Sequence, residues 1–505
     1  MKETSGSGGG GASYSRRELV RRGIGGALAL RAAAAWPVAP ARAAADPRLA
    51  ALHRTLDGDL IARGAPGYAQ ARLGWNPRFD GVRPLAVAYA KTIADVRRVI
   101  QWANRYGVRL ATRSGGHSFA GYSTTSGLVL DLSRLTNVHL NPGGTASVAA
   151  GTKLGSVYRR LSAVGRAVPF GTCEAVGVSG LTLGGGHGYS SRALGLACDN
   201  VVKIEIVTAD GQVRVSDAHS EPELFWALRG AGAGNFGVVT KLVYRTHPVD
   251  FVTTVSLNWP WADARQVAQA WQAFAPGAPD SISCSLSFAP PPTAGGTPLV
   301  AVNGQIFGTR DEALSLLAPL TDAVRPSRLS AVHRPFISAV RYFAADNPAR
   351  RSFAAKSNYG VAPLPDAGID VIIGALESAA RDPRLGAVGI LLYAHGGAIN
   401  SVDANATAYA HRSALFSIRY TAFWSMAAST DIAAAHLSWV RGAHAAMQPF
   451  VSRGAVANYA DPELENWCAA YYGPHLRRLV AVKRRYDPDN FFRFPQGIPT
   501  RLPGP

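Results

Sequence analysis

The sequence predicts an α+β fold with two sheet-containing parts, and three observations indicate it. From about residue 85 to residue 246, short strand-like runs alternate with amphipathic helical segments. Near residue 250 the glycines become sparse, and longer helical segments appear between strands. From Asn458 onward, aromatic clusters indicate a return to the first part. With 505 residues, 47% of them hydrophobic, the chain can bury the cores of two or three structural units.

The first part is expected to open with a strand at 85–89 and a helix at 92–106. In that helix Ile93, Val96 and Ile100 recur with the spacing of one helical face. These elements are short, as in an α+β region. The other elements expected here are strands at 109–113, 127–132, 146–150, 201–207 and 238–246, and helices at 153–164 and 223–228.

The second part is expected to begin near residue 250, with longer helices at 262–275 and 310–323. Strands at 389–395 and 415–424, joined by a long loop, indicate an antiparallel sheet. The predicted division is a first domain at 46–250, a second domain at 251–445, and a segment at 446–505 that completes the first domain.

Residues 1–45 have the composition of an export signal. The sequence Ser15-Arg16-Arg17-Glu18-Leu19 precedes a mildly apolar stretch and a small-residue cleavage site at Ala43 or Ala45. Paired arginines are typical of the twin-arginine route, which carries proteins that are already folded. We therefore expect export to the periplasm or the medium, and a basic unstructured tail is the alternative interpretation.

Composition and charge exclude other classes. The formal charge of +19 is spread along the chain rather than gathered in a basic helix or tail, which argues against nucleic-acid binding. No run of about 18 apolar residues is present to span a bilayer. The four cysteines, Cys173, Cys198, Cys284 and Cys468, lack the spacing of a zinc site. In an exported protein they can form two disulfides, but burial of each one singly is the expectation.

Two glycine-rich segments are candidates for ligand binding. The sequence Arg113-Ser114-Gly115-Gly116-His117-Ser118 follows a predicted strand, and its glycines can expose backbone N–H groups to phosphate oxygens. A second segment, at 171–188, is dense in glycine, which indicates backbone wrapped around a planar or phosphorylated ligand. Taken alone, each segment can also be an ordinary turn or loop.

A third segment, at 230–237, contains the pattern GxGxxG. The dinucleotide-binding fingerprint requires a strand before the glycines and a helix after them. Here a helix is expected before the glycines and a strand after them, so a Rossmann nicotinamide site is not predicted.

Together these motifs resemble the berberine-bridge-enzyme-like FAD-linked oxidases. The resemblance is carried by the segment at 113–118, Gly171-Thr172-Cys173 with Val176-Gly177, Gly184-Gly185-Gly186, the run Gly234-Asn235-Phe236-Gly237-Val238-Val239-Thr240, and Tyr486-Asp487-Pro488-Asp489-Asn490 with Gln496. It is dense over residues 80–250 and resumes at 458–499. It implies a two-part FAD-binding domain of the PCMH type, a substrate domain with an antiparallel sheet, and FAD as the cofactor.

By this resemblance, FAD is bonded twice, from His117 to its 8α-methyl group and from Cys173 to C6. These positions are neighbours on the flavin, so the two loops are expected to converge. Val176 matches the family position above flavin C4a, where a small side chain leaves room for O2 and favours an oxidase. The residues expected to bind the cofactor are Arg113, Ser114, Gly115, Gly116, His117, Ser118, Cys173, Val176, Gly177, Gly180, Gly184, Gly185, Gly237, Val239 and Asn490; no metal is expected.

The substrate side is expected on the strands of the second part. Alternation places Tyr393 and His395 on one face of the strand at 389–395. If that face meets the flavin, the Tyr393 phenol can accept a proton from a substrate hydroxyl; otherwise Tyr393 is a core aromatic residue. On the next strand Arg419 stands where relatives place a carboxylate or amide, and its guanidinium can lower the pKa of a neighbouring phenol.

The chain departs from its relatives at Val456-Ala457-Asn458-Tyr459, where they often carry Tyr-x-Asn-Tyr. The tyrosine most often assigned as the base is therefore Val456 here. Tyr459 is one residue out of step, and strand alternation predicts that it points to the opposite face. Tyr393, Arg419 and Tyr459 are the candidate catalytic residues.

The predicted function is oxidation of a hydroxyl group of a small-molecule carbohydrate or natural product, with O2 reoxidising the flavin to give hydrogen peroxide. Two alternatives stay open: a dehydrogenase of the same fold that uses another electron acceptor, and a non-catalytic exported flavin-binding protein, to which Val456 points. The substrate and the oligomeric state are left undetermined by the sequence.

Overall fold

A four-stranded sheet comes first in the computed structural model, which describes residues 46–291, 296–344 and 350–503. Its strands β2, β4 and β3 are parallel, and β1 is antiparallel to β2 at the edge. Helix α4 (Ile93–Arg105) connects β2 to β3, and a Thr92–Asp95 capping box fixes its start. The strand order is β1 (Asp59–Ala62), β2 (Ala86–Tyr89), β4 (Leu128–Asp131) and β3 (Leu110–Arg113).

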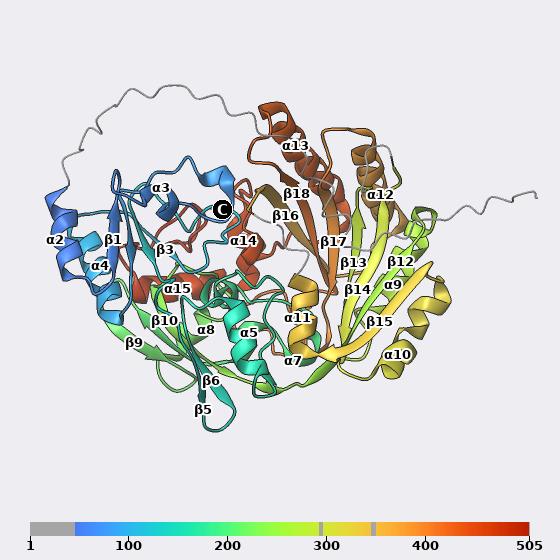
Figure 1. Cartoon of the computed structure of the whole chain (residues 1–505), viewed down its shortest axis with the longest axis horizontal. Helices are drawn as coiled ribbons and strands as arrows, with labels where there is room; N and C mark the ends of the chain where they lie inside the picture. Colours follow the sequence, from blue (N-terminus) through green and yellow to red (C-terminus); the bar gives the residue numbers. More distant parts are fainter. Residues whose placement is uncertain (1–45, 292–295, 345–349, 504–505) are drawn as a thin grey trace, which may run out of the picture. The chain divides into compact units, whose positions relative to one another are not determined.

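A five-stranded antiparallel sheet forms the other half of the first part (Figure 1). Helix α5 (Leu154–Ser162) follows β6, and helix α8 (Pro222–Ala227) precedes β10. The glycine-rich pattern at 230–237 thus lies between a helix and a strand, as predicted, which is the reverse of a dinucleotide fingerprint. The strand order is β5 (Val138–Asn141), β6 (Thr145–Ala149), β10 (Val238–Arg245), β8 (Val201–Val207) and β9 (Val213–Ser216).

The second part is built on a seven-stranded antiparallel sheet, which confirms the predicted sheet type. The predicted strands at 389–395 and 415–424 are the neighbours β17 and β18. The strand order is β15 (Arg328–Pro335), β12 (Phe251–Trp259), β14 (Leu299–Ile306), β13 (Ile282–Ala289), β17 (Val388–Ala394), β18 (Phe416–Trp424) and β16 (Ser352–Gly360).

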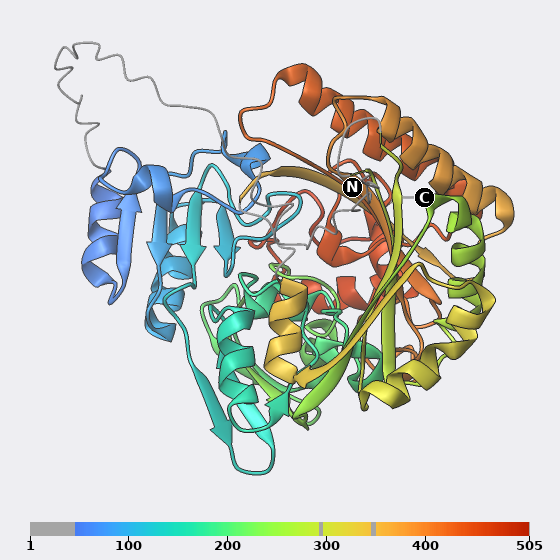
Figure 2. The same cartoon turned by 45° about the vertical axis from the view of Figure 1, so that its right-hand side comes forward.

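Helices pack on the outer face of this sheet, toward the right of Figure 2. They include α9 (Ala264–Phe274), α10 (Arg310–Ala323), α12 (Asp366–Arg381) and α13 (Thr430–Met447). Alternate strand residues such as Leu286, Leu392 and Ile418 pack with these helices in one hydrophobic core. The residues between them, such as Ser285, Tyr393 and Arg419, therefore occupy the opposite face. That face meets the first part, because the Tyr189 and Ser285 hydroxyls are 2.7 Å apart.

The last segment returns to the first part, as predicted. Helices α14 (Trp467–Tyr472) and α15 (Leu476–Tyr486) contribute residues to the same core as the five-stranded sheet. After α15, the fully buried Lys483 ammonium donates to Asp487 Oδ2 at 2.6 Å and to two backbone carbonyls. Asp487 also accepts the backbone N–H groups of Phe491 and Phe492. One buried ion pair thus holds the turn that carries Asn490.

We expect Asp487→Ala to lower the free energy of unfolding by about 3–5 kcal/mol, because the Lys483 charge would stay buried without its partner. Urea unfolding followed by circular dichroism measures this loss. Lys203→Met is the matched control, since Lys203 and Asp217 form an exposed pair with a 3.6 Å separation, and such pairs contribute about 0–1 kcal/mol. Equal effects of the two substitutions would contradict the prediction.

Several sequence predictions can be compared with this fold directly. The expected strands and helices are present with ends shifted by at most a few residues, whereas β1 and β5 and the strands β12 to β16 were not specified. All four cysteines are free, so the disulfide alternative is wrong, and Cys198, Cys284 and Cys468 are buried. Within the described part of the chain, no helix is long and apolar enough to cross a membrane. The predicted export signal lies outside the described residues.

Candidate active site

The two glycine-rich segments of the first part are in direct backbone contact. The first follows β3, and the second leads into helix α6 (Val178–Leu183). A Cβ atom on Gly115 would lie 2.3 Å from the backbone nitrogen of Gly177, and one on Gly177 would lie 2.1 Å from Ser114 Oγ. No side chain larger than hydrogen fits there. The loops bearing His117 and Cys173 are therefore held against each other.

We expect Gly177→Ala to destabilise this junction by about 1–3 kcal/mol, because the added methyl group has no space without a backbone shift. The loss should appear in urea unfolding, together with a lower ratio of flavin to protein. Gly442→Ala, in α13, is the control: nothing lies within 4 Å of the added methyl group. Glycine inside a helix is destabilising, so this control should gain about 0.5–1 kcal/mol. Unchanged stability and flavin content in Gly177→Ala would show that the contact is unimportant.

His117 stacks on Trp75, with ring centroids 4.3 Å apart and an angle of 18° between the rings. The Trp75 N–H also donates to the carbonyl of Gly116, which ties the two residues together. Burial, together with the nearby charge of Lys153, lowers the pKa of His117 to about 4. The imidazole is therefore neutral near pH 7 and has a free lone pair for bond formation. Sequence reasoning missed Trp75.

Cys173 lies on the facing loop and is partly exposed, whereas the other three cysteines are buried. Burial raises the pKa of the Cys173 thiol, so it is protonated near neutral pH. Val176 is held close by, because its N–H donates to the Cys173 carbonyl and its own carbonyl accepts from Leu154 at the start of α5.

Some residues predicted to bind the cofactor have structural partners instead. The Arg113 guanidinium is buried, pairs with Asp131 and donates to the Ala71 carbonyl, so it is not free for a ligand. Val239 is buried in the core of the first part, and a Cβ on Gly237 would lie 2.4 Å from the Val207 carbonyl. The side chains of Arg113 and Val239 thus have structural roles, and the prediction that these positions bind the cofactor rests on their backbone groups.

Other predicted residues shape the backbone of the site. Ser114 Oγ donates to the Ala150 carbonyl, and Ser118 Oγ accepts the Tyr122 N–H. Asn490 has a positive φ of 52°, which asparagine tolerates better than most residues.

The glycines of the second segment fall into two groups. Gly180 faces open space, since nothing lies within 4 Å of the position of a Cβ. A Cβ on Gly184 would lie 2.1 Å from Asn458 Oδ1, and Gly185 has a φ of 111° and a ring edge of Tyr409 beside it. Asn458 Nδ2 in turn donates to the Leu181 carbonyl at 2.9 Å. The glycines at 184–185 thus admit the C-terminal segment that carries Tyr459.

The three candidate catalytic residues come together. Leu391 of β17 is the pairing partner of Arg419 on β18, so Tyr393 is a diagonal neighbour of Arg419 on the same face. The Arg419 guanidinium carbon is 5.9 Å from the centre of the Tyr393 ring and 5.3 Å from that of Tyr459. Tyr459 also stacks on Phe119, two residues after His117, with centroids 5.1 Å apart.

The strand-based expectation for Tyr459 is therefore wrong. Residues Ala457–Tyr459 form a 3-10 turn rather than a strand, so alternation by two residues does not apply. The turn places Tyr459 beside Arg419, whereas Val456 packs against the cluster that contains Tyr359 and Tyr409. Position 456 has no phenol in this chain, but Tyr459, three residues later, places one beside Arg419.

The pKa values around Arg419 are set by burial and by its charge. Burial raises the pKa of Tyr393 to about 12, although the Arg419 charge acts in the opposite direction. Burial acts to lower the pKa of Arg419, but the Tyr393 and Tyr459 phenols outweigh it and the net shift is upward. Arg419 therefore favours phenolate formation, as predicted, while burial keeps Tyr393 protonated near neutral pH.

Two further side chains, His187 and Tyr189, lie near Tyr393. The sequence analysis did not single them out as catalytic. His187, within Gly184–Gly188, has its ring centre 5.2 Å from those of Tyr393 and His395. Burial lowers the pKa of His187 to about 4, so this ring is neutral. Tyr189 lies 6.1 Å from Tyr393, ring centre to ring centre, and reaches Ser285. In the sequence, both residues follow directly after the glycines at 184–186, and this position is the pattern from which they could have been predicted.

The residues at this junction fit a flavin. A neutral imidazole and a thiol occupy loops in contact, and Gly180, in the helix that follows the Cys173 loop, has open space where a side chain would lie. The loop after His117 also carries Tyr122 Oη and Thr124 Oγ1, which are buried without a hydrogen-bond partner in the described structure. Polar atoms buried in this way usually have a partner, which a polar cofactor can supply.

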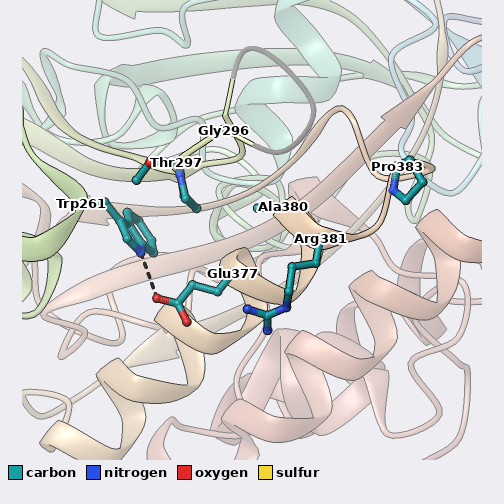
Figure 3. A pocket seen from close by; sticks show the side chains of 8 residues that line it. Trp261, Gly296, Thr297, Glu377, Ala380, Arg381 and Pro383 are labelled. Carbon is teal, nitrogen blue, oxygen red and sulfur yellow. Dashed lines mark hydrogen bonds between the residues drawn. The ribbon is translucent and has the colours of Figure 1, made fainter.

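A separate hollow lies beside helix α12 in the second part (Figure 3). It measures about 400 Å³, and Trp261, Thr297 and residues of α12 line it. The Trp261 indole N–H donates to Glu377 Oε1 at 3.1 Å. Because α12 covers the face opposite to Tyr393, this hollow is separate from the junction described above.

Comparisons with known proteins settle the family. Residues 84–217 match the FAD binding domain, and residues 455–499 match the berberine and berberine-like domain. The FAD-linked oxidoreductase YgaK of Bacillus subtilis is 33% identical over 88% of this chain and 97% of its own length. The chain belongs to the berberine-bridge-enzyme-like family.

This berberine-bridge-enzyme-like protein also matches relatives of known structure or activity. The structure of BBE-like 1 from Physcomitrella patens has a TM-score of 0.82 and 29% identity, over 90% of this chain and 99% of that one. The chitooligosaccharide oxidase of Gibberella zeae is 28% identical over 86% of this chain and 91% of its own length. The chain is therefore an FAD-linked oxidoreductase with an α+β fold and FAD as cofactor. His117 and Cys173 lie within the first matched domain, and Tyr459 and Asn490 within the second.

Proposed function

We propose that this protein binds FAD covalently through His117 and Cys173 and oxidises a hydroxyl group of a carbohydrate or natural product. The observation that supports this most directly is the contact of the two loops at Gly115 and Gly177. Phe119 then links the His117 loop to Tyr459 and so to Arg419. Attachment groups and candidate proton acceptors therefore lie around one site.

The chemistry that bound FAD supplies is two-electron acceptance from the carbinol carbon, with O2 as the final acceptor and hydrogen peroxide as the product. In our proposal the Tyr393 oxygen takes the substrate hydroxyl proton. Arg419 stabilises the negative charge on that oxygen through the space between the two side chains. Trp75 fixes the ring of His117, and Asn458 fixes the turn that carries Tyr459.

A carbohydrate or similarly hydroxylated substrate suits the face that carries Tyr393. Its neighbours on β13 and β14 are polar, namely Ser283, Ser285, Ser287, Asn303 and Gln305. Hydroxyl and amide groups in this number can hydrogen-bond a ligand with several hydroxyls. The chitooligosaccharide oxidase among the relatives supports the same class.

The test is anaerobic mixing of the holoenzyme with carbohydrates and secondary-metabolite alcohols, with flavin absorbance as the readout. We expect at least one alcohol to bleach the flavin, and hydrogen peroxide to form when air is admitted. Failure of every alcohol to bleach it would favour a non-catalytic binding protein. Slow return of the colour in air would favour a dehydrogenase over the oxidase that the small side chain of Val176 indicates.

Export is part of the proposal, on the strength of the paired arginines at Arg16-Arg17. Replacing both by lysine should retain the flavoprotein in the cytoplasm. Unchanged export of that variant would exclude the twin-arginine route.

A further inference from the structure

Arg419 is a partly buried cation without an acidic partner in the described structure. Its Nε–H is buried and makes no hydrogen bond. Within residues 46–291, 296–344 and 350–503, no carboxylate forms an ion pair with it, and the phenols of Tyr393, Tyr459 and Tyr189 are the groups that raise its pKa most. Because a neutral phenol does not cancel a positive charge, the guanidinium has no counter-ion there.

Three buried arginines elsewhere in the described structure have carboxylate or backbone partners for their charge. Arg113 pairs with Asp131, and Arg412 donates to both carboxylate oxygens of Asp199. Arg192 has no acidic partner, but its three nitrogens donate to backbone carbonyls, including those of Ile282 and Pro276. Buried charge is costly unless paired or fully hydrogen-bonded. Arg351 also has an unpartnered Nε–H, but it lies over the Phe423 ring. Arg419 lies between candidate catalytic phenols, so it is the arginine that can take a partner supplied from outside the chain.

The surroundings of Arg419 indicate the shape of that partner. The rings of Tyr459 and Tyr393 both lie near its guanidinium. Phe119 stacks on Tyr459, and Tyr189 lies near Tyr393. Aromatic rings thus border a guanidinium whose fork geometry matches a carboxylate. The formal charge of +19 adds a field that attracts anions to the protein as a whole.

We propose that the substrate carries a carboxylate, which pairs with Arg419 while the hydroxyl beside it is oxidised. This inference rests on the proposed function and names its substrate class. The carboxylate contributes two oxygen acceptors, one of which can take the unpartnered Nε–H. Arg419 then selects the substrate in addition to acting on Tyr393. A carboxylated sugar and a carboxylated aromatic alcohol share this chemistry.

The test compares matched pairs that differ only in charge. The aromatic pair is 4-(hydroxymethyl)benzoate and 4-(hydroxymethyl)benzamide, and the sugar pair is a methyl glucuronoside and its C6 amide. In one pair, kcat/KM for flavin reduction should favour the acid by about 100-fold or more. The pair that shows the preference tells which scaffold carries the carboxylate. Equal kcat/KM values within both pairs would overturn the inference.

Variants separate this role from a structural one. Arg419→Met should lower turnover of both members through Tyr393, but it should also remove the preference for the acid. Arg419→Lys should restore part of that preference, because it restores the charge. Ser417→Ala, on the same face of β18, should leave the ratio unchanged. A ratio that stays constant in Arg419→Met would contradict the proposal.

A binding measurement keeps the inference testable when no alcohol is oxidised. The non-oxidisable 4-methylbenzoate should perturb the flavin absorbance of the holoenzyme at concentrations where 4-methylbenzamide does not. Acid-selective binding that is lost in Arg419→Met would support the carboxylate site even if the proposed oxidation failed. Equal binding of acid and amide, or binding of neither, would overturn the site.

Discussion

Replacing both His117 and Cys173 by alanine is expected to release the flavin completely when the protein is denatured. Each single replacement should leave the flavin attached through the other residue. The physical reason is that each residue forms its own bond to the flavin, and the backbone contact at Gly115 and Gly177 keeps both loops in place when one side chain is removed. The neutral imidazole of His117 is available for bond formation near neutral pH.

The measurement is filtration of the denatured protein, followed by flavin absorbance in the filtrate and the retentate. Cys284→Ala is the matched control, since that thiol is buried in the core of the second part and should not change flavin retention. If the wild-type protein releases its flavin into the filtrate, covalent attachment is excluded. Retention in the double variant would show that another residue forms a bond.

Tyr393→Phe should lower kcat for flavin reduction by about 10²–10⁴-fold, the usual contribution of a general base. The variant keeps the ring that contacts His187 and removes only the oxygen. Anaerobic stopped-flow measurement with a substrate found by the alcohol screen gives this rate. Tyr420→Phe is the control, because Tyr420 faces the helices and its hydroxyl is buried without a partner in the described structure. It should leave the rate unchanged.

The pH dependence gives a second readout of the same residue. Burial raises the pKa of Tyr393 to about 12, so the phenolate fraction, and with it kcat/KM, should rise with pH across the alkaline range. Arg419 acts to lower that pKa, and Arg419→Gln should therefore move the rise to higher pH. Tyr393→Phe should flatten the profile. If Tyr459→Phe flattens it and Tyr393→Phe does not, Tyr459 is the base.

Much of the fold was accessible from sequence patterns because the elements are regular. The helix at 92–106 is found at Ile93–Arg105, since its apolar spacing and its capping residues are local signals. β13 was not specified, although Ile282, Cys284 and Leu286 alternate with serines. β16 has buried residues throughout, so it carries no alternation to detect.

In the candidate site, too, some residues could be predicted from local sequence patterns and others could not. The sequence by itself determined the chemistry-bearing motifs, because glycines beside His117 and Cys173 are required by close backbone contact. It also determined which residues of β17 share a face, because strand alternation is a local property. Only the tertiary structure decided that Arg113 is paired with Asp131, that Trp75 stacks on His117, and that a 3-10 turn brings Tyr459 to an unpaired Arg419. Those contacts join segments far apart in the chain, and no local pattern specifies which distant side chain satisfies a buried charge or ring.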